Sequence, residues 1–338
     1  MFMNNLITAL KYPHKLSLFQ IMRDGQAFLR LHFLYSAYES GLLNALTSPR
    51  TQSELENLLQ IKRPDMLKAL LDLGTGLKEL SCKRGRYQLK GRRAMILARP
   101  DGDALAAVVQ GNITYYNSIY RHASDRLKGA DQGDYLPQIG GLVARYSSLM
   151  EPYLRNFLAE VIPSTPPPRI LDIGCGSGTN LRSAYMVNQG IHGVGLDKDA
   201  DVVNQASRNM AAWNLEDRIK VMLGDIRQPP DQLGEGFDVI FMLNLVYYFA
   251  PDDRTGLFKA LKTRLSPGGK LAIVNTVQGN GRDFWAANLD MAVNSIKGCW
   301  PLPDLNELKD QLDQAGYWDI TVTRVMPGGS LFGLTAHS

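Results

Sequence analysis

Three glycines at alternate positions are the feature of this sequence whose residue types and spacing bear most directly on chemistry. The segment Ile170-Leu-Asp-Ile-Gly-Cys-Gly-Ser-Gly-Thr-Asn180 begins with apolar residues typical of a buried strand and continues through Gly174, Gly176 and Gly178. Glycine permits the backbone conformations of a tight strand-to-helix turn and lets a ligand approach the main chain closely. We therefore expect a ligand-binding turn followed by a helix.

Two acidic residues follow, each at the end of a predicted strand. Gly193-Val-Gly-Leu196 leads into Asp197, and Ile219-Lys-Val-Met-Leu223 leads into Gly224-Asp225-Ile226. Because parallel strands end at the same edge of a sheet, both carboxylates should lie beside the glycine turn. Asp197 is suited to accept both hydroxyls of a ribose, and Asp225 to contact an adenine amino group. A nicotinamide-binding turn would show G-x-G-x-x-G instead, so we predict a different adenosyl ligand.

From Arg169 to about Ser338 the sequence resembles the class I S-adenosylmethionine-dependent methyltransferases. The resemblance rests on the motifs above and on Leu265-Ser-Pro-Gly-Gly-Lys270, before the fifth expected strand. It implies an α/β fold with a Rossmann-like parallel sheet, helices on both faces and a closing hairpin over 317–325 and 330–336. The implied cofactor is S-adenosylmethionine. The residues expected to bind it are Asp172, Gly174, Cys175, Gly176, Gly178, Asn180, Asp197, Lys198, Asp225, Ile226 and Asn244.

The segment after the fourth expected strand departs from the O-methyltransferases within this class. Those enzymes carry a histidine base in a His-Asp-Trp-like segment, where this chain has Tyr247 followed by Tyr248. Their Gly-Gly-x-x-Arg-Thr segment and its acid are replaced by Lys297-Gly-Cys-Trp-Pro-Leu302. We predict that Tyr247 orients the acceptor or acts as a base; simple packing beside the cofactor is the alternative. A neutral hydroxyl must lose its proton, so an easily ionised oxygen, a carbon nucleophile or a neutral amine remain as acceptors.

Aromatic residues indicate the nature of the acceptor. The helix predicted from about 103 to 127, the helix before the linker and the segment after the fifth strand all carry large rings. We expect them to line a site for a small, largely apolar and aromatic or polyene-like metabolite, although such stripes also occur in ordinary helix cores. The candidate residues are Tyr115, Tyr116, Tyr146, Met150, Tyr248, Trp285, Asn288, Met291 and Trp300.

The front of the chain is predicted to be mainly helical. Apolar spacing predicts helices over 28–40, 51–60 and 64–73, the second with a capping box at its start, and a hairpin over 82–89 that turns at Gly85. Three helices followed by a hairpin are typical of a winged-helix domain.

This front region, from Tyr35 to about Gly129, also resembles the dimerisation domain of the small-molecule O-methyltransferases. The similar segments are Ala37–Leu46, Thr51–Leu55, Lys68–Gly74 and Gly85–Leu89. The resemblance implies a homodimer.

A proline-rich stretch, Pro163-Ser-Thr-Pro-Pro-Pro168, marks the clearest boundary. We therefore expect three parts. They are a winged-helix-like dimerisation domain over 1–130, a connecting helix and linker over 131–168, and the methyltransferase domain over 169–338.

Charge is unevenly distributed along the chain. The net charge is +4, but residues 1–130 hold 19 Lys and Arg against 10 Asp and Glu, and the remainder holds 18 against 23. A carrier protein is a conceivable partner for the basic hairpin, whereas a solvated surface is the simpler interpretation. The hairpin cations are Lys83, Arg84, Arg86, Lys90, Arg92 and Arg93.

Two alternative functions stay open. Asn244 and Tyr247 have the Asn-x-x-Tyr spacing of nucleic-acid amino-methyltransferases without the two prolines, but the helix over 64–73 carries one lysine and two acids and is poorly suited to nucleic acid. The missing histidine leaves open a catalytically inactive cofactor-binding module.

Composition favours a soluble cytoplasmic protein. Neither a signal peptide nor a run of about 18 apolar residues is present in the sequence. Three separated cysteines do not suggest a disulfide framework, and five scattered histidines do not suggest a metal site. They are Cys82, Cys175 and Cys299, and His14, His32, His122, His192 and His337.

Overall fold

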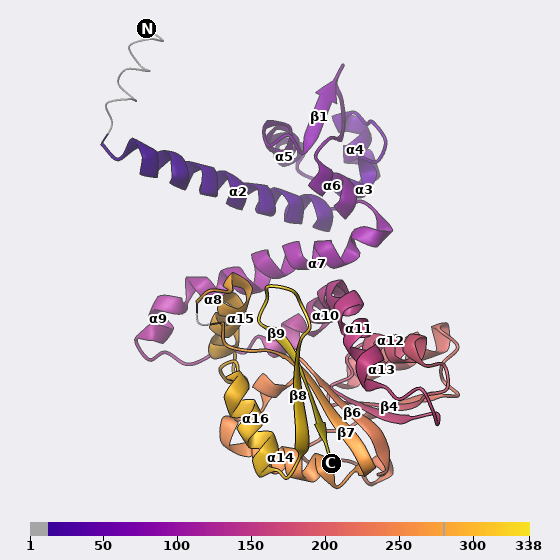
Figure 1. Ribbon diagram of the computed structural model, residues 1–338. Helices are drawn as coiled ribbons and strands as arrows, with labels where there is room; N and C mark the ends of the chain where they lie inside the picture. Colours follow the sequence, from indigo (N-terminus) through magenta and orange to yellow (C-terminus); the bar gives the residue numbers. More distant parts are fainter. Residues whose placement is uncertain (1–12, 280) are drawn as a thin grey trace. The chain divides into compact units, whose positions relative to one another are not determined.

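The computed structural model describes residues 13–279 and 281–338, without the side chains of residues 138 and 139 (Figure 1). Contacts between residues divide the chain into two compact units, residues 1–118 and residues 119–338. The division falls between Ser118 and Ile119. The boundaries predicted at residues 130 and 168 stay predictions.

The described part of the first unit is mainly helical, with one small hairpin. Thr51 and Glu54 form the predicted capping box, because each side chain accepts a hydrogen bond from the other residue's backbone N–H. The hairpin turns at Gly85, which has φ of 74°. The elements are α2 (Lys15–Glu39), α3 (Leu42–Ala45), α4 (Gln52–Leu58), α5 (Pro64–Gly76), β1 (Leu80–Lys83), β2 (Arg86–Leu89), α6 (Arg92–Leu97) and α7 (Asp103–Gly111).

Helix α2 begins 13 residues earlier than the predicted start at residue 28. Its C-terminal part packs into the core of the unit through Phe33, Leu34 and Ala37. The part before residue 28 leaves large apolar side chains in solvent, among them Leu16 and Phe19, which are 74% and 60% exposed. The apolar spacing predicted only the C-terminal part of α2, because only that part packs one apolar face against the core.

The prediction of one continuous helix over 103–127 is wrong. After α7 the chain forms a π-helical segment over Asn112–Tyr116 and then α8 (Asn117–Arg121) and α9 (Ala123–Leu127). The Asn112 amide donates to the Val108 carbonyl (2.8 Å), and the Thr114 hydroxyl donates to the Gln110 carbonyl (2.8 Å). Such side-chain hydrogen bonds compete with the regular helical pattern.

The second unit contains a seven-stranded sheet in the order β5-β4-β3-β6-β7-β9-β8. Strands β3 to β7 are parallel, and β9 runs antiparallel to both β7 and β8. The winding direction reverses between β3 and β6, which places a ligand site at their carboxyl ends. The strands are β3 (Arg169–Ile173), β4 (His192–Asp197), β5 (Ile219–Leu223), β6 (Phe237–Leu243), β7 (Leu265–Thr276), β8 (Trp318–Arg324) and β9 (Leu331–His337).

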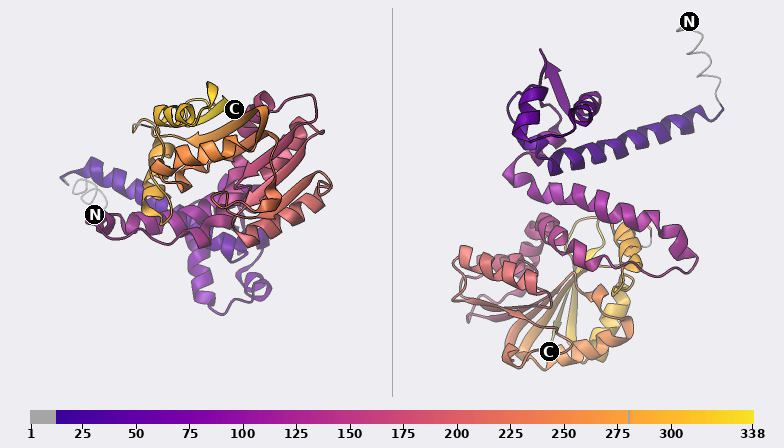
Figure 2. Two further views of the ribbon diagram at one scale, coloured as in Figure 1. Left: turned by 90° about the horizontal axis from the view of Figure 1, so that it is seen from below. Right: turned by 180° about the vertical axis from the view of Figure 1, so that it is seen from behind.

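Helices cover both faces of this sheet (Figure 2). Alternate residues of each strand serve opposite faces: Leu171 and Ile240 join the core beneath α14 and α16, whereas Ile170 and Val239 join the core beneath α11, α12 and α13. The helices are α10 (Leu136–Ser147), α11 (Glu151–Val161), α12 (Thr179–Val187), α13 (Ala200–Ala212), α14 (Pro251–Lys262), α15 (Phe284–Ser295) and α16 (Leu305–Gln314). The predicted sheet and closing hairpin are confirmed.

Two further points concern surfaces. Arg86 pairs with Glu54 and Arg93 pairs with Glu79, so two of the six hairpin cations already have acidic partners. A membrane span requires a long apolar helix, and none of the described helices combines the length and the apolar character needed to cross a bilayer.

Candidate active site

The glycine turn lies between β3 and α12. Gly176 has φ of 55°, and a Cβ built on it meets no atom within 4 Å, so the space above this residue is open to a ligand. Gly178 has φ of 81°, and a Cβ there would lie 2.2 Å from the Met210 Cε atom of α13. Gly176 therefore leaves room for a ligand, and Gly178 allows α12 and α13 to pack closely.

Asp197, at the end of β4, is bonded directly to this turn. One carboxylate oxygen accepts from the Gly176 N–H at 3.0 Å, and the other accepts from the Asp199 N–H at 3.1 Å. The Gly174 N–H also donates to the Leu196 carbonyl at 2.8 Å. A carboxylate has about four lone-pair positions, so Asp197 keeps acceptor capacity for the hydroxyls of a bound ribose.

Asp172 and Asn244 place buried acceptor atoms near the same edge. Asp172 is 1% exposed, and neither of its carboxylate oxygens has a partner among the described residues. Burial, with a further contribution from the negative Asp197, raises the pKa of Asp172 to about 8. The Asn244 Oδ1 atom is likewise buried without a donor, on a residue with φ of 53°. Unsatisfied buried acceptors of this kind suit a cationic or donor-bearing ligand.

Asp225 lies after β5 and has a partner that the sequence analysis missed. The Arg227 guanidinium contacts the Asp225 carboxylate at 2.5 Å, and this hydrogen bond holds the Asp225 pKa below its usual range. Arg227 also lies 6.0 Å from the centre of the Phe249 ring. Asp-x-Arg spacing was the available signal, because it lets the guanidinium fold back on the acid. The neighbouring Ile226 is buried and provides an apolar surface.

The remaining predicted cofactor residues surround this arrangement. Cys175 is buried in the turn, Asn180 is half-buried in the first turn of α12, and Lys198 is exposed immediately after Asp197. Burial raises the pKa of the Cys175 thiol well above its usual range, so it stays protonated. The binding roles of these residues stay predictions.

Tyr247 and Tyr248 lie on a short 3₁₀ turn, Val246–Tyr248, at the end of β6. Their ring centres are 4.8 Å apart and their side chains are hydrogen-bonded to each other. Burial raises the pKa of Tyr248 well above its usual range, so its hydroxyl stays protonated and able to donate. The Trp300 N–H donates to the Tyr247 carbonyl at 2.8 Å. The structure thus brings these three predicted residues together.

The other predicted acceptor residues are more dispersed. Trp285 is 67% exposed and stacks edge-on against Phe284, with ring centres 5.1 Å apart. Asn288 accepts a hydrogen bond from the Tyr120 hydroxyl at 2.8 Å. Their contact with an acceptor stays a prediction, as it does for the residues that remain. Those are Tyr146, Met150 and Met291, half-buried in the second unit, and Tyr115 and Tyr116, whose rings pack against each other in the first.

Histidine is absent from this edge in the described part of the second unit. His192 and His337 lie at the opposite edge of the sheet, where they pair in register with Arg169 and Lys270, and His122 is exposed between α8 and α9. The described residues also contain no group of three His, Cys, Asp or Glu side chains arranged to hold a metal ion.

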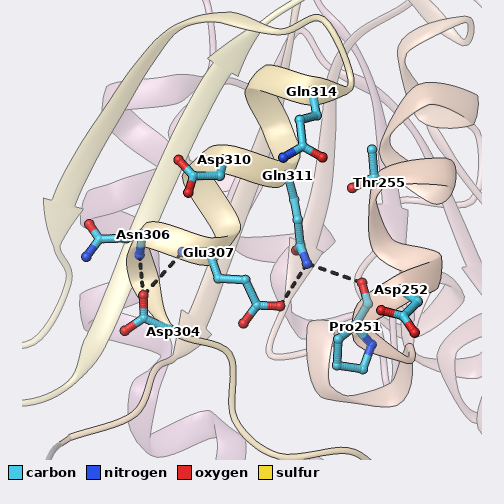
Figure 3. A pocket seen from close by; sticks show the side chains of 9 residues that line it. All are labelled: Pro251, Asp252, Thr255, Asp304, Asn306, Glu307, Asp310, Gln311 and Gln314. Carbon is cyan, nitrogen blue, oxygen red and sulfur yellow. Dashed lines mark hydrogen bonds between the residues drawn. The ribbon is translucent and has the colours of Figure 1, made fainter.

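A cleft of about 590 Å³ lies elsewhere, between α14 and α16 (Figure 3). We call it the acidic cleft because four of its residues are carboxylic acids. None of the predicted site residues lines it. Its lining residues are Pro251, Asp252, Thr255, Asp304, Asn306, Glu307, Asp310, Gln311 and Gln314.

Comparison with known proteins relates this arrangement to methyl transfer. Residues 170–269 match a family described as a methyltransferase domain. L-tyrosine C(3)-methyltransferase of Streptomyces lavendulae is 23% identical over 276 residues, which cover 74% of this chain and 75% of the relative. Demethylspheroidene O-methyltransferase of Rhodobacter capsulatus is 23% identical over 285 residues, 78% of this chain and 67% of the relative.

Solved structures show the same fold. The mitomycin 7-O-methyltransferase MmcR aligns with a TM-score of 0.79 at 14% identity, covering 95% of this chain and 97% of its own. PigF with SAH also aligns with a TM-score of 0.79 at 14% identity, covering 97% and 100%.

These findings confirm the predicted fold class and S-adenosylmethionine as cofactor. The residues present fit that molecule, because Gly176 opens onto free space, Asp197 retains acceptor capacity and Asp172 offers buried acceptors that lack a donor. When bound, the cofactor supplies an electrophilic methyl group on a positively charged sulfur.

Replacing Asp197 should weaken cofactor binding. We expect Asp197→Ala to lower the binding free energy of S-adenosylhomocysteine by about 1–3 kcal/mol, because charge-assisted hydrogen bonds to the ribose are lost. Titration calorimetry measures this directly. Asp199→Ala is the matched control, since it removes the N-cap of α13 rather than a proposed ligand contact. Equal affinity of Asp197→Ala and the wild type would refute the assignment.

Asp172 should make stability depend on pH. Its folded-state pKa of about 8 lies above the ordinary value of 3.8, so the folded protein holds a proton that the unfolded chain releases between these pH values. The free energy of unfolding contributed by Asp172 therefore falls as pH rises from about 4 through about 8. Denaturant titrations should show the free energy of unfolding of Asp172→Asn rising relative to that of the wild type across this pH window. We also expect this variant to bind the cofactor more weakly. Parallel pH profiles of the two proteins would contradict the buried, protonated Asp172.

Proposed function

We propose that this chain, an S-adenosylmethionine-dependent methyltransferase of the class I, small-molecule O-methyltransferase-like type, methylates a small, largely apolar metabolite. The observation that carries the finer part of this proposal is the pair of tyrosines at the end of β6, where the described unit offers no histidine. Trp300, whose backbone N–H donates to the Tyr247 carbonyl, adds a further aromatic residue to this part of the chain, which favours an aromatic or otherwise apolar acceptor.

The chain's own groups favour orientation over proton abstraction. Tyr248 stays protonated and can donate a hydrogen bond, while its neighbour Tyr247 is held against Trp300 through the backbone. Much of the acceleration in such a reaction comes from holding the nucleophile in line with the methyl carbon. We infer that the acceptor is an easily ionised oxygen, an electron-rich carbon or a neutral amine, for which a strong protein base is unnecessary.

Two relatives support an acceptor of this range. One is named for methylation at C(3) of L-tyrosine, and the other for O-methylation of demethylspheroidene. Both names describe small-molecule acceptors, one methylated at carbon and one at oxygen. The alignments with both extend across about three quarters of this chain.

Methyl transfer can be tested with cofactor labelled in its methyl group and a fractionated extract of small molecules. We expect label in an organic-extractable product, and a Tyr247→Phe variant that transfers at least about tenfold more slowly with unchanged cofactor affinity, because the acceptor loses a hydrogen bond. Tyr185→Phe, on α12, is the matched control.

The result also distinguishes the alternatives. Cofactor binding without transfer to any small-molecule fraction would favour an inactive binding module, and label in added nucleic acid would favour base methylation. Full activity of Tyr247→Phe would remove Tyr247 from the mechanism.

We also propose that the protein is a homodimer joined through α2. A second copy would cover six apolar side chains of this helix that are 49% to 74% exposed. They are Leu16, Phe19, Ile21, Met22, Phe28 and Leu29.

Light scattering should report a dimer for the wild type and a monomer for the double variant Ile21→Glu, Met22→Glu, because the two charges oppose burial of the helix. Gln26→Glu adds a charge to the same helix without removing an apolar group and should stay dimeric. A monomeric wild type would refute this interface.

A further inference from the structure

Asn275 is a buried polar residue whose position calls for a function. It lies in β7, is 0% exposed and is flanked along the chain by apolar residues such as Val274 and Val277. Its Oδ1 atom accepts from the Val246 N–H at 3.2 Å, and its Nδ2 atom donates to the Thr276 carbonyl at 2.7 Å. Burying an amide group lowers stability unless the group is hydrogen-bonded. Here one of its bonds reaches Val246, the first residue of the 3₁₀ turn Val246–Tyr248, which we call the tyrosine turn.

Arg254 reaches the other end of the same turn. This residue of α14 is 1% exposed, and its Nε atom donates to the Phe249 carbonyl at 3.1 Å. Burial lowers the pKa of Arg254, while the Glu307 carboxylate, 3.7 Å from its Nη1 atom, opposes this shift. An arginine buried this deeply is a poor choice for packing alone.

Glu307, the acidic partner of Arg254, belongs to the acidic cleft (Figure 3). Glu307 lines the cleft and also accepts from the Gln311 Nε2 atom at 2.8 Å. That same amide nitrogen donates to the Pro251 carbonyl at 3.2 Å, which joins α16 to the start of α14. The Arg254 side chain is therefore backed by two helices rather than by one flexible contact.

A third bond fixes the middle of the turn. The Trp300 N–H donates to the Tyr247 carbonyl, and the segment around Trp300 is itself held because the Leu302 N–H donates to the Asp290 carboxylate at 2.9 Å. Strand β7, helix α14 and the loop that contains Trp300 thus hold the backbone at Val246, Phe249 and Tyr247. These bonds fix the backbone from which the two tyrosine rings project.

We propose that Asn275 and Arg254 are positioning residues of methyl transfer, which fix the Tyr247–Tyr248 turn by hydrogen bonds to Val246 and Phe249. This inference rests on the proposed function insofar as the tyrosines orient the acceptor. Displacement of a reacting group by about 1 Å can cost about a hundredfold in rate, so loosening this backbone should slow transfer without altering the cofactor site.

The hydrogen bond at Val246 can be tested in the full chain without any acceptor. In Asn275→Leu we expect amide exchange at Val246 to accelerate at least about tenfold, because its acceptor is lost. We expect the ¹³Cζ resonances of Tyr247 and Tyr248 to shift as well. Asn275→Asp keeps an oxygen that can accept from Val246 and should restore its protection. Asn188→Leu, which removes an asparagine bonded to the Pro163 carbonyl away from the turn, should leave Val246 protected.

A kinetic test separates positioning from general stability. With an acceptor found by labelled transfer, Asn275→Leu and Arg254→Met should each lower kcat at least about tenfold while the Kd for S-adenosylhomocysteine stays unchanged. In a Tyr247→Phe, Tyr248→Phe background the same replacements should add little, because they act through the tyrosines.

Unchanged Val246 exchange and unchanged tyrosine resonances in both the Asn275 and the Arg254 variants would overturn the proposal whether or not an acceptor is known. Fully multiplicative losses in the double-tyrosine background would overturn it too. Absence of transfer by the wild type would count against the proposed function alone, since the exchange and resonance measurements need no activity.

Discussion

The hydrogen bond between the Gly176 N–H and the Asp197 carboxylate is the contact on which the proposed cofactor site depends. It joins the turn after β3 to the end of β4, so the backbone that faces a ligand is bonded directly to the acid proposed to hold its ribose. Gly176 can make this contact because its φ of 55° is open to glycine, and because the space beyond it is free.

The same edge of the sheet also holds a buried carboxyl group that lowers the stability of the free protein. Burial and the negative Asp197 both raise the pKa of Asp172 and so favour its protonated form, and its oxygens lack partners among the described residues. Natural proteins retain such destabilising groups where a ligand repays the cost. The tyrosine turn contrasts with it, because there the buried polar groups of Asn275 and Arg254 are used to hold the backbone. The Asp172 carboxyl group therefore has unbonded oxygens that a ligand can contact, whereas the tyrosine turn is already held by hydrogen bonds within the protein.

Local patterns foretold local structure well. The alternate glycines, the acids at strand ends and the Thr51 capping box each act over a few residues, so their spacing alone indicates the geometry. Arg227, Asn275 and Arg254 were missed because their roles arise from where a side chain meets backbone or acid in three dimensions. Asn275 and Val246 are 29 residues apart, and nothing in a strand of apolar residues distinguishes a packed amide from a bonded one. The unpacked half of α2 and the π-helical segment were missed for a related reason, since neither follows the spacing of a single buried helix face.

A crystal structure of the full chain with S-adenosylhomocysteine tests the central claim most directly. We expect the ribose hydroxyls on the Asp197 carboxylate, the adenine beside Asp225 and Ile226, and the amino-acid portion over the glycine turn. Density for the nucleoside at another place, such as the acidic cleft, or a ribose with no contact to Asp197, would contradict the assignment of this edge as the methyl-donor site.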